Sequence, residues 1–145
     1  MKRAINWLYA SDITLNTYYY VHDIKNAIIP NFIEIIEPVA FGRCKYLQKV
    51  EFQIDSKLSI ISQYAFLESS IESITILSHT TIIDDYAFHF CRNLCHVEIK
   101  NDSEIKTIGH CAFYNSAIES ITIPPNLVEL REEWCRETSF SNTII

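Results

Sequence analysis

The chain has 145 residues, 48% of them hydrophobic, and a formal net charge of −6. This length predicts one domain with a sizeable core, and no apolar run approaches the ~18 residues of a membrane-spanning helix. The acidic balance argues against a nucleic-acid partner, which usually binds a basic stripe. With only two glycines, the chain has no phosphate-binding glycine loop.

The first thirteen residues show no convincing repeat, and we predict that residues 1–13 form an N-terminal cap or a degenerate coil. A basic start, Met1-Lys2-Arg3, precedes a short apolar stretch that is interrupted by Asn6. This stretch is at the lower limit for a signal peptide, so we expect no cleaved signal. Taken alone, the missing signal favours a cytoplasmic or non-classically exported chain.

From residue 14 onwards the chain repeats around an Ala-Phe pair. The phenylalanines are 25, 22 and 25 residues apart, and an isoleucine precedes each alanine by four residues. Self-similarity at such a period is typical of a solenoid. We predict repeat units at 14–35, 36–60, 61–82, 83–107 and 108–129, and a truncated unit at 130–145. The four Ala-Phe pairs are Ala40-Phe41, Ala65-Phe66, Ala87-Phe88 and Ala112-Phe113.

Each unit has the same predicted internal structure. A run that alternates apolar and polar residues, such as Ile74-Thr75-Ile76, predicts a half-buried strand. An apolar pair at spacing three, such as Leu58 and Ile61, predicts a short extended return segment, and the Ala-Phe pair predicts a helical or 3₁₀ turn. Stacked units would close one continuous core. We therefore expect one parallel sheet on one face and short turns or 3₁₀ segments opposite.

The repeat resembles a known family. Its short form reads Ile108-Gly109, Ala112-Phe113, Ser116, Ile118, Ile121-Thr122-Ile123-Pro124, Leu127 and Leu130, and its long form carries Cys44-Lys45-Tyr46-Leu47 and Cys91-Arg92-Asn93-Leu94. Over residues 14–145 this pattern resembles the BspA-like leucine-rich repeat family of surface proteins. The resemblance implies a right-handed leucine-rich repeat solenoid, protein binding or adhesion, and a place at the cell surface. It implies no catalytic chemistry and no cofactor.

The cysteines and histidines suggest one local metal site, which the repeat argues against. His89, Cys91, Cys95 and His96 offer four zinc-ligand types within eight residues. Cys91, however, shares the repeat position of Cys44 and should be buried, whereas His96 should lie on the exposed face. We therefore expect no zinc site there. Cys95 and His96 are adjacent, so as strand residues they would point to opposite faces and could not share a proton for nucleophilic catalysis.

The outward residues of the predicted strands form the candidate protein-binding face. Charged residues occupy the long units and hydroxyl residues the short ones. We expect a non-enzymatic protein-binding domain, with cell-surface adhesion as one form of it. The alternatives are a spacer segment of a longer repeat protein without its own ligand and, last, a metal-dependent enzyme. A glycosidase-like role for Glu51 and Glu98 is disfavoured, because they are two coils apart. The face comprises Lys49, Glu51, Ser73, Thr75, His96, Glu98, Ser120 and Thr122.

The truncated last unit ends in Thr143-Ile144-Ile145, with no later segment to cover it. Repeat arrays need a polar terminal cap, and an apolar edge strand can pair with another chain. We therefore predict self-association through the C-terminal coil, or membership of a longer array.

Overall fold

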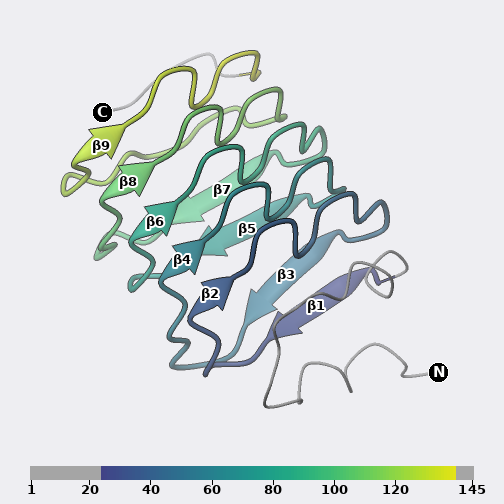
Figure 1. The fold of residues 1–145 in the computed structure, drawn as a ribbon, viewed down its shortest axis with the longest axis vertical. Coiled ribbons are helices and arrows are strands. Elements are labelled where there is room, and N and C mark those ends of the chain that lie inside the picture. Colours follow the sequence, from purple (N-terminus) through teal and green to yellow (C-terminus); the bar gives the residue numbers. More distant parts are fainter. Residues whose placement is uncertain (1–23, 140–145) are drawn as a thin grey trace.

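A computed structural model describes residues 24–139 of the chain, which form a solenoid of stacked coils (Figure 1). No helix occurs in this part of the chain, and hence none that is long and apolar enough to span a membrane. The predictions for residues 1–13 and for Thr143–Ile145 lie outside the described residues. Two series of parallel strands stack along the solenoid axis.

The longer strands form the predicted parallel sheet. Its order is β1-β3-β5-β7, which follows the order of the coils along the chain. Inward residues such as Val50 and Ile74 are buried, whereas the residues that alternate with them along each strand are exposed or half-buried. The alternation of apolar and polar residues therefore predicts the faces of this sheet correctly. The strands are β1 (Asn26–Ile29), β3 (Lys49–Phe52), β5 (Ser73–Ile76) and β7 (His96–Ile99).

The return segments pair into a second parallel sheet. Each contributes a strand of two residues, in the order β2-β4-β6-β8-β9. We call it the return sheet. In β2, β4, β6 and β8 the second residue is a buried isoleucine. The return segments are extended as expected, but hydrogen bonds between coils join them, so the described coils form two parallel sheets rather than the one we expect from the sequence. The strands are β2 (Ile35–Ile36), β4 (Ile60–Ile61), β6 (Ile82–Ile83), β8 (Thr107–Ile108) and β9 (Glu129–Leu130).

The Ala-Phe segments are chains of tight turns rather than helical turns. In the first of them, the amides of Ala40, Gly42 and Cys44 each donate to the carbonyl three residues earlier. Two residues in every segment have a left-handed backbone: the one before the alanine position and the one two after the phenylalanine position. An α-helix or 3₁₀-helix cannot contain such residues. They are Val39, Arg43, Tyr64, Glu68, Tyr86, Phe90, Cys111, Asn115, Glu133 and Glu137.

The same turns hydrogen-bond each coil to the next. The Phe41 amide donates to the Ala65 carbonyl at 2.7 Å, and the Phe88 amide donates to the Ala112 carbonyl at 2.7 Å. The Phe113 amide donates to the carbonyl of Trp134, also at 2.7 Å, so Trp134 takes the alanine position in its coil. These bonds pair backbone polar groups beside the buried phenylalanines, as burial requires.

A ladder of phenylalanines fills the core beneath these turns. Phe41, Phe66, Phe88 and Phe113 are all buried and stack at centroid distances of 5.0, 5.0 and 5.1 Å. The indole of Trp134 meets the last ring edge-on at 6.4 Å. The phenylalanines of the repeated Ala-Phe pairs thus form one continuous ladder, and its spacing matches the ~4.8 Å between neighbouring strands.

One glycine is required by the close packing of two coils. A Cβ on Gly109 would lie 2.4 Å from the carbonyl carbon of Asp84 and from the amide nitrogen of Asp85. The same place in other units holds Ser62 or Asp84. Glycine therefore allows the coil of residues 108–129 to approach the preceding coil closely here.

Candidate functional site

The outward residues of the four-stranded sheet form one exposed surface, which we call the strand face. The pairing places Lys49 beside Ser73 and Ser73 beside His96. A second row aligns Thr75 with Glu98. Six of the eight predicted face residues therefore lie on one sheet: Lys49, Glu51, Ser73, Thr75, His96 and Glu98.

The last two predicted face residues lie beyond this sheet. Ser120 and Thr122 are exposed, but their segment forms only an isolated bridge at Thr122 and no strand. The ladder of long strands ends at β7 among the described residues. Whether any of the eight residues binds a partner stays a prediction.

A short network holds Glu98 in place on the strand face. Lys100 Nζ donates to Glu98 Oε1 at 2.7 Å, and Thr75 Oγ1 donates to Glu98 Oε2 at 3.0 Å. These two hydrogen bonds, with that of Lys100 the stronger, lower the pKa of Glu98. Lys49 pairs with Glu51 within β3. The face therefore presents alternating charge that is fixed by local contacts.

The sheet is split between β3 and β5. β1 pairs with β3, and β5 with β7, over four residues each, whereas β3 pairs with β5 only at Lys49 and Ser73. In each of the two fully paired strand pairs, the residue after the later strand also donates a backbone hydrogen bond to the earlier strand. The Gln53 amide donates to the Ile29 carbonyl, and the Lys100 amide donates to the Ile76 carbonyl. The described backbone bonds include no equivalent from Leu77 to Phe52.

A groove of about 470 Å³ opens at this split on the strand face. We call it the strand groove. The inward end of β3 carries Phe52, which is only half-buried, where Ile29, Ile76 and Ile99 are buried on the other strands. Phe52 is thus the residue by which β3 departs from the other long strands, and it lies at the end where β3 loses its pairing with β5. The lining comprises Ile28, Lys49, Val50, Glu51, Phe52, Ser73, Ile74, Thr75 and Leu77.

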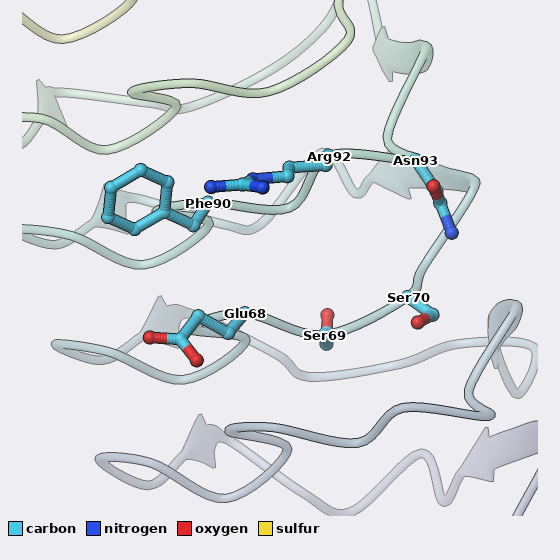
Figure 2. Close-up of a pocket in the computed structure, with 6 residues that line it drawn as sticks. All are labelled: Glu68, Ser69, Ser70, Phe90, Arg92 and Asn93. Atoms are coloured by element: carbon cyan, nitrogen blue, oxygen red, sulfur yellow. The ribbon is translucent and has the colours of Figure 1, made fainter.

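A second hollow of about 440 Å³ lies at the edge of the solenoid (Figure 2). Phe90, Arg92 and Asn93 line it from one coil, and Glu68, Ser69 and Ser70 from the preceding coil. The guanidinium carbon of Arg92 lies 5.4 Å from the centroid of the Phe90 ring. The extra residue of the long unit lies in this segment. The Glu68 carboxylate pairs with Arg43, and Ser69 Oγ contacts Cys91 Sγ at 3.5 Å, so no described hydrogen bond joins that carboxylate to a serine of the hollow.

The four zinc-ligand types of residues 89–96 are not gathered. Cys91 is buried, and its thiol donates to the Phe66 carbonyl at 2.9 Å. His96 is exposed on β7, and Cys95 donates to the Glu72 carbonyl at 3.6 Å outside the core. His89 stacks on Tyr114 at 4.9 Å. The repeat register therefore predicts these positions correctly.

Burial makes two of the thiols poor nucleophiles. It raises the pKa of Cys44 and of Cys91 to about 12 each. Thiolates, not thiols, are the nucleophiles and metal ligands. Ser69 and Ser116 occupy the same repeat position as these cysteines and are also buried, so the position is a packed polar turn.

The carboxylates of Glu51 and Glu98 do not share a site. Glu51 lines the strand groove, whereas Glu98 is engaged by Lys100 and Thr75 at the far side of β5. A glycosidase needs two carboxylates on either side of one bond. The described residues offer no such arrangement here.

Sequence reasoning did not single out one cluster. Ligand atoms of His110, Cys111 and Glu133 all lie within 4.8 Å of one another, and they are the only such group of three among residues 24–139. The signal lies in the coil register, because Cys111 and Glu133 both directly precede the alanine position of their coils.

The repeat of turns and strands matches one protein family over residues 11–143, in six copies described as "BspA type Leucine rich repeat region". The chain belongs to this leucine-rich repeat family. The predicted resemblance and the predicted solenoid are thereby confirmed. No functionally curated protein matches the chain.

Two solved structures of bacterial proteins share the fold. The pneumococcal vaccine antigen PcpA superposes with a TM-score of 0.77 at 26% identity, over 82% of this chain and 30% of the antigen. A leucine-rich cell surface protein from Faecalibacterium prausnitzii A2-165 gives a TM-score of 0.54 at 20% identity, over 88% of this chain and 40% of that one. This chain thus spans less than half the length of either.

Proposed function

We propose that this chain is a non-enzymatic, protein-binding repeat domain whose strand face contacts the partner. The observation that carries the proposal is the strand groove, an opening of about 470 Å³ in an otherwise exposed and charged parallel sheet. Leucine-rich repeat proteins use such extended sheets as binding surfaces. The groove adds partly exposed apolar side chains, Ile28 and Phe52, to a lining that also carries the charged residues Lys49 and Glu51.

The composition of the face fits a protein surface better than a small molecule. Interfaces between proteins combine an apolar centre with a polar rim. Here Phe52 and Ile28 form the apolar centre, and the rim carries Lys49, Glu51 and Glu98. The groove is open to solvent and brings together no group of reactive side chains, which is why we propose no reaction.

The setting we propose is a cell surface, where the domain would serve in adhesion. Two lines support this: membership of the BspA-type family and similarity to a protein named as a cell surface protein. The competing function is that of a spacer within a longer repeat protein, with no ligand of its own. That reading is favoured by the length of the structural relatives, of which this chain spans 30% and 40%.

Two charge-reversal variants with the same net charge distinguish a protein-binding domain from a spacer. The test variant, Lys49→Glu/Glu51→Lys/Glu98→Lys, alters only exposed residues of the strand face. The control, Lys106→Glu/Glu34→Lys/Glu104→Lys, alters exposed residues on the side of the return sheet. Each variant exchanges two glutamates and one lysine, so both have the same net charge. Proteins captured by the parent from host-cell or self extracts would be purified and titrated against all three by calorimetry.

The proposal predicts at least ~10-fold weaker binding by the strand-face variant, because rim charges that meet complementary charge set specificity and association. The control variant should bind like the parent. Equal affinity of parent and strand-face variant for every purified partner would contradict the proposal and favour the spacer. Circular dichroism and thermal unfolding check that both variants are folded.

A further inference from the structure

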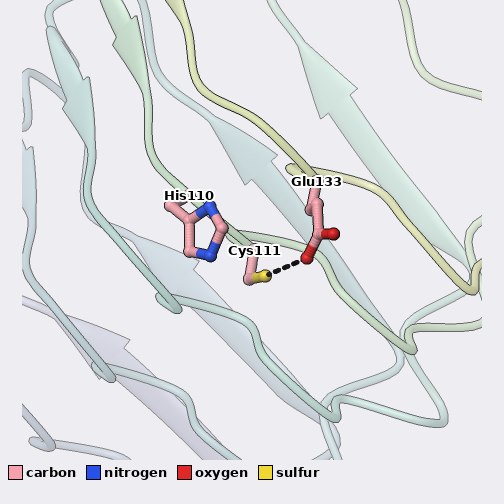
Figure 3. A group of neighbouring side chains, drawn as sticks. All are labelled: His110, Cys111 and Glu133. Atoms are coloured by element: carbon pink, nitrogen blue, oxygen red, sulfur yellow. Dashed lines mark hydrogen bonds between the residues drawn. The ribbon is translucent and has the colours of Figure 1, made fainter.

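Three metal-ligand side chains meet between the last two described coils. His110 and Cys111 come from the turn before Ala112, and Glu133 comes from the equivalent turn of the next coil (Figure 3). Their nitrogen, sulfur and oxygen atoms lie within 4.8 Å of one another. They are separate from the strand face, because they lie on the turns and not on the long strands.

The repeat geometry explains why two of them are neighbours. Cys111 and Glu133 both have the left-handed conformation that precedes the alanine position, with φ of 50° and 57°. Side chains at this position stack from coil to coil: Tyr64 and Tyr86, at the same place in earlier coils, lie 5.0 Å apart. At the end of this column the aromatic rings give way to a thiol and a carboxylate.

The distance between these two groups suits a tetrahedral ion. Cys111 Sγ–H donates to Glu133 Oε2 at 3.7 Å. Ligands that bind zinc at ~2.3 Å through sulfur and ~2.0 Å through oxygen, at a tetrahedral angle, are about 3.5 Å apart. An ion could therefore replace the shared proton with little movement of either side chain. The imidazole of His110 lies beside them and offers the third ligand atom (Figure 3).

Neighbouring groups orient two of the ligands. Arg136 Nη1 donates to Glu133 Oε1 at 2.5 Å, which leaves Oε2 on the side of Cys111. The His110 ring meets the Tyr86 ring edge-on at 5.4 Å, and the His110 amide donates to Asp85 Oδ1 at 2.7 Å. Such outer contacts fix ligand orientation in metal sites.

The ligand types select the ion. A thiolate and an imidazole disfavour Mg²⁺ and Ca²⁺, which take oxygen ligands, and they suit Zn²⁺. We propose that His110, Cys111 and Glu133 bind one Zn²⁺ ion, with a water molecule as the fourth ligand, and so clip the last two described coils together. On binding, the thiol proton of Cys111 passes to solvent and the sulfur becomes a thiolate ligand. The role is structural, and no reaction is proposed.

Cobalt titration tests the site directly, because tetrahedral Co²⁺ with a thiolate ligand gives visible and charge-transfer absorption that Zn²⁺ does not. Reduced, chelator-treated protein would be titrated with Co²⁺ and then with Zn²⁺. The expected result is one Co²⁺ per chain with a thiolate band, displaced by one Zn²⁺. Zn²⁺ should also raise the melting temperature, as any ligand of the folded state does.

Single substitutions assign the ligands. Cys111→Ser should remove the thiolate band, and Glu133→Gln should weaken Zn²⁺ binding by at least ~10-fold while leaving Cys111 in place. The matched controls, Cys95→Ser and Glu132→Gln, change an exposed thiol and the neighbouring carboxylate and should bind like the parent. The proposal is overturned if the parent gives no tetrahedral Co²⁺ spectrum at stoichiometric metal. It is also overturned if the band survives Cys111→Ser or disappears in Cys95→Ser.

Discussion

Phe66 and Phe88, from consecutive coils, stack with their ring centroids 5.0 Å apart and their planes 4° from parallel. Both rings are fully buried, and Phe88 continues the stack to Phe113 at 5.1 Å. Each ring therefore packs against the coil before it and the coil after it. The ladder couples the coils, and a change in one ring should affect the stability of the whole array.

Phe88→Ala should lower the free energy of unfolding by about 3–5 kcal/mol, the usual cost of removing a buried aromatic ring. Chemical denaturation would measure it. The matched control is Phe32→Ala, because the Phe32 side chain is 51% exposed; its effect should be well under half as large. A loss below about 1 kcal/mol for Phe88→Ala would mean that the ladder contributes little to stability.

Left-handed backbone positions in the turns lower the stability of the fold where the residue type does not suit them, and substitution can relieve this strain. Val39 has a φ of 63°, which is unfavourable for a β-branched residue. Asn115 has a φ of 52°, a conformation that asparagine adopts readily. Val39→Asn should raise the free energy of unfolding by about 1 kcal/mol, and Asn115→Val should lower it by a similar amount. Urea denaturation of both variants checks this. Changes of the same sign in the two variants would contradict the explanation by backbone conformation.

The buried thiols predict a dependence of stability on alkaline pH. Burial raises the pKa of Cys44 and Cys91 from the ordinary value of 9.0 to about 12. Below pH 9 both the folded and the unfolded chain keep these protons. Between pH 9 and pH 12 the unfolded chain loses protons that the folded chain retains, so the free energy of unfolding must fall as the pH rises.

Serine substitution isolates that effect. Cys44→Ser/Cys91→Ser removes both thiols, and Ser69 and Ser116 already occupy the same repeat position in other coils. Urea midpoints measured from about pH 8 to pH 11 should fall less steeply for this variant than for the parent. Cys95→Ser, which removes an exposed thiol, should follow the parent. Identical slopes in the parent and the double variant would show that the buried thiols do not ionise on unfolding.

The strand groove gives a further prediction, which concerns Phe52 at the end of β3. Phe52→Ile restores the residue type that β5 and β7 carry at this position, as Ile76 and Ile99. We expect β3 to pair with β5 along its length, so that the Leu77 amide becomes protected. Hydrogen exchange should show Leu77 exchanging faster than Lys100 in the parent, and at a similar rate in the variant. Unchanged fast exchange at Leu77 would show that Phe52 does not cause the split.

Most of the fold follows from the sequence, because a repeat presents the same pattern several times. The apolar spacing of Ile74 and Ile76 identifies a strand and its inner face, and the burial of Phe41 to Phe113 follows from their period. The turn geometry does not follow. Left-handed residues such as Val39 and Tyr86 are not glycines, so no residue type marks these turns in advance.

The candidate site is less predictable, because it depends on places where the chain departs from the repeat. Lys49, Ser73 and His96 align because the period sets the register. The strand groove opens where β3 and β5 lose the pairing that the pattern predicts, and Ser120 and Thr122 leave the sheet although they fit the pattern. The cluster of His110, Cys111 and Glu133 requires a contact between coils that local spacing does not contain. Self-association through the C-terminal coil stays a prediction.

The most direct test of protein binding through the strand face is a hydrogen-exchange footprint of the domain with its purified partner. The account predicts that protection increases on β3 and β5 around the strand groove, at residues 49–53 and 73–77, and not on β4 and β6 of the return sheet. Protection confined to β4 and β6, with residues 49–53 and 73–77 unchanged, would contradict it.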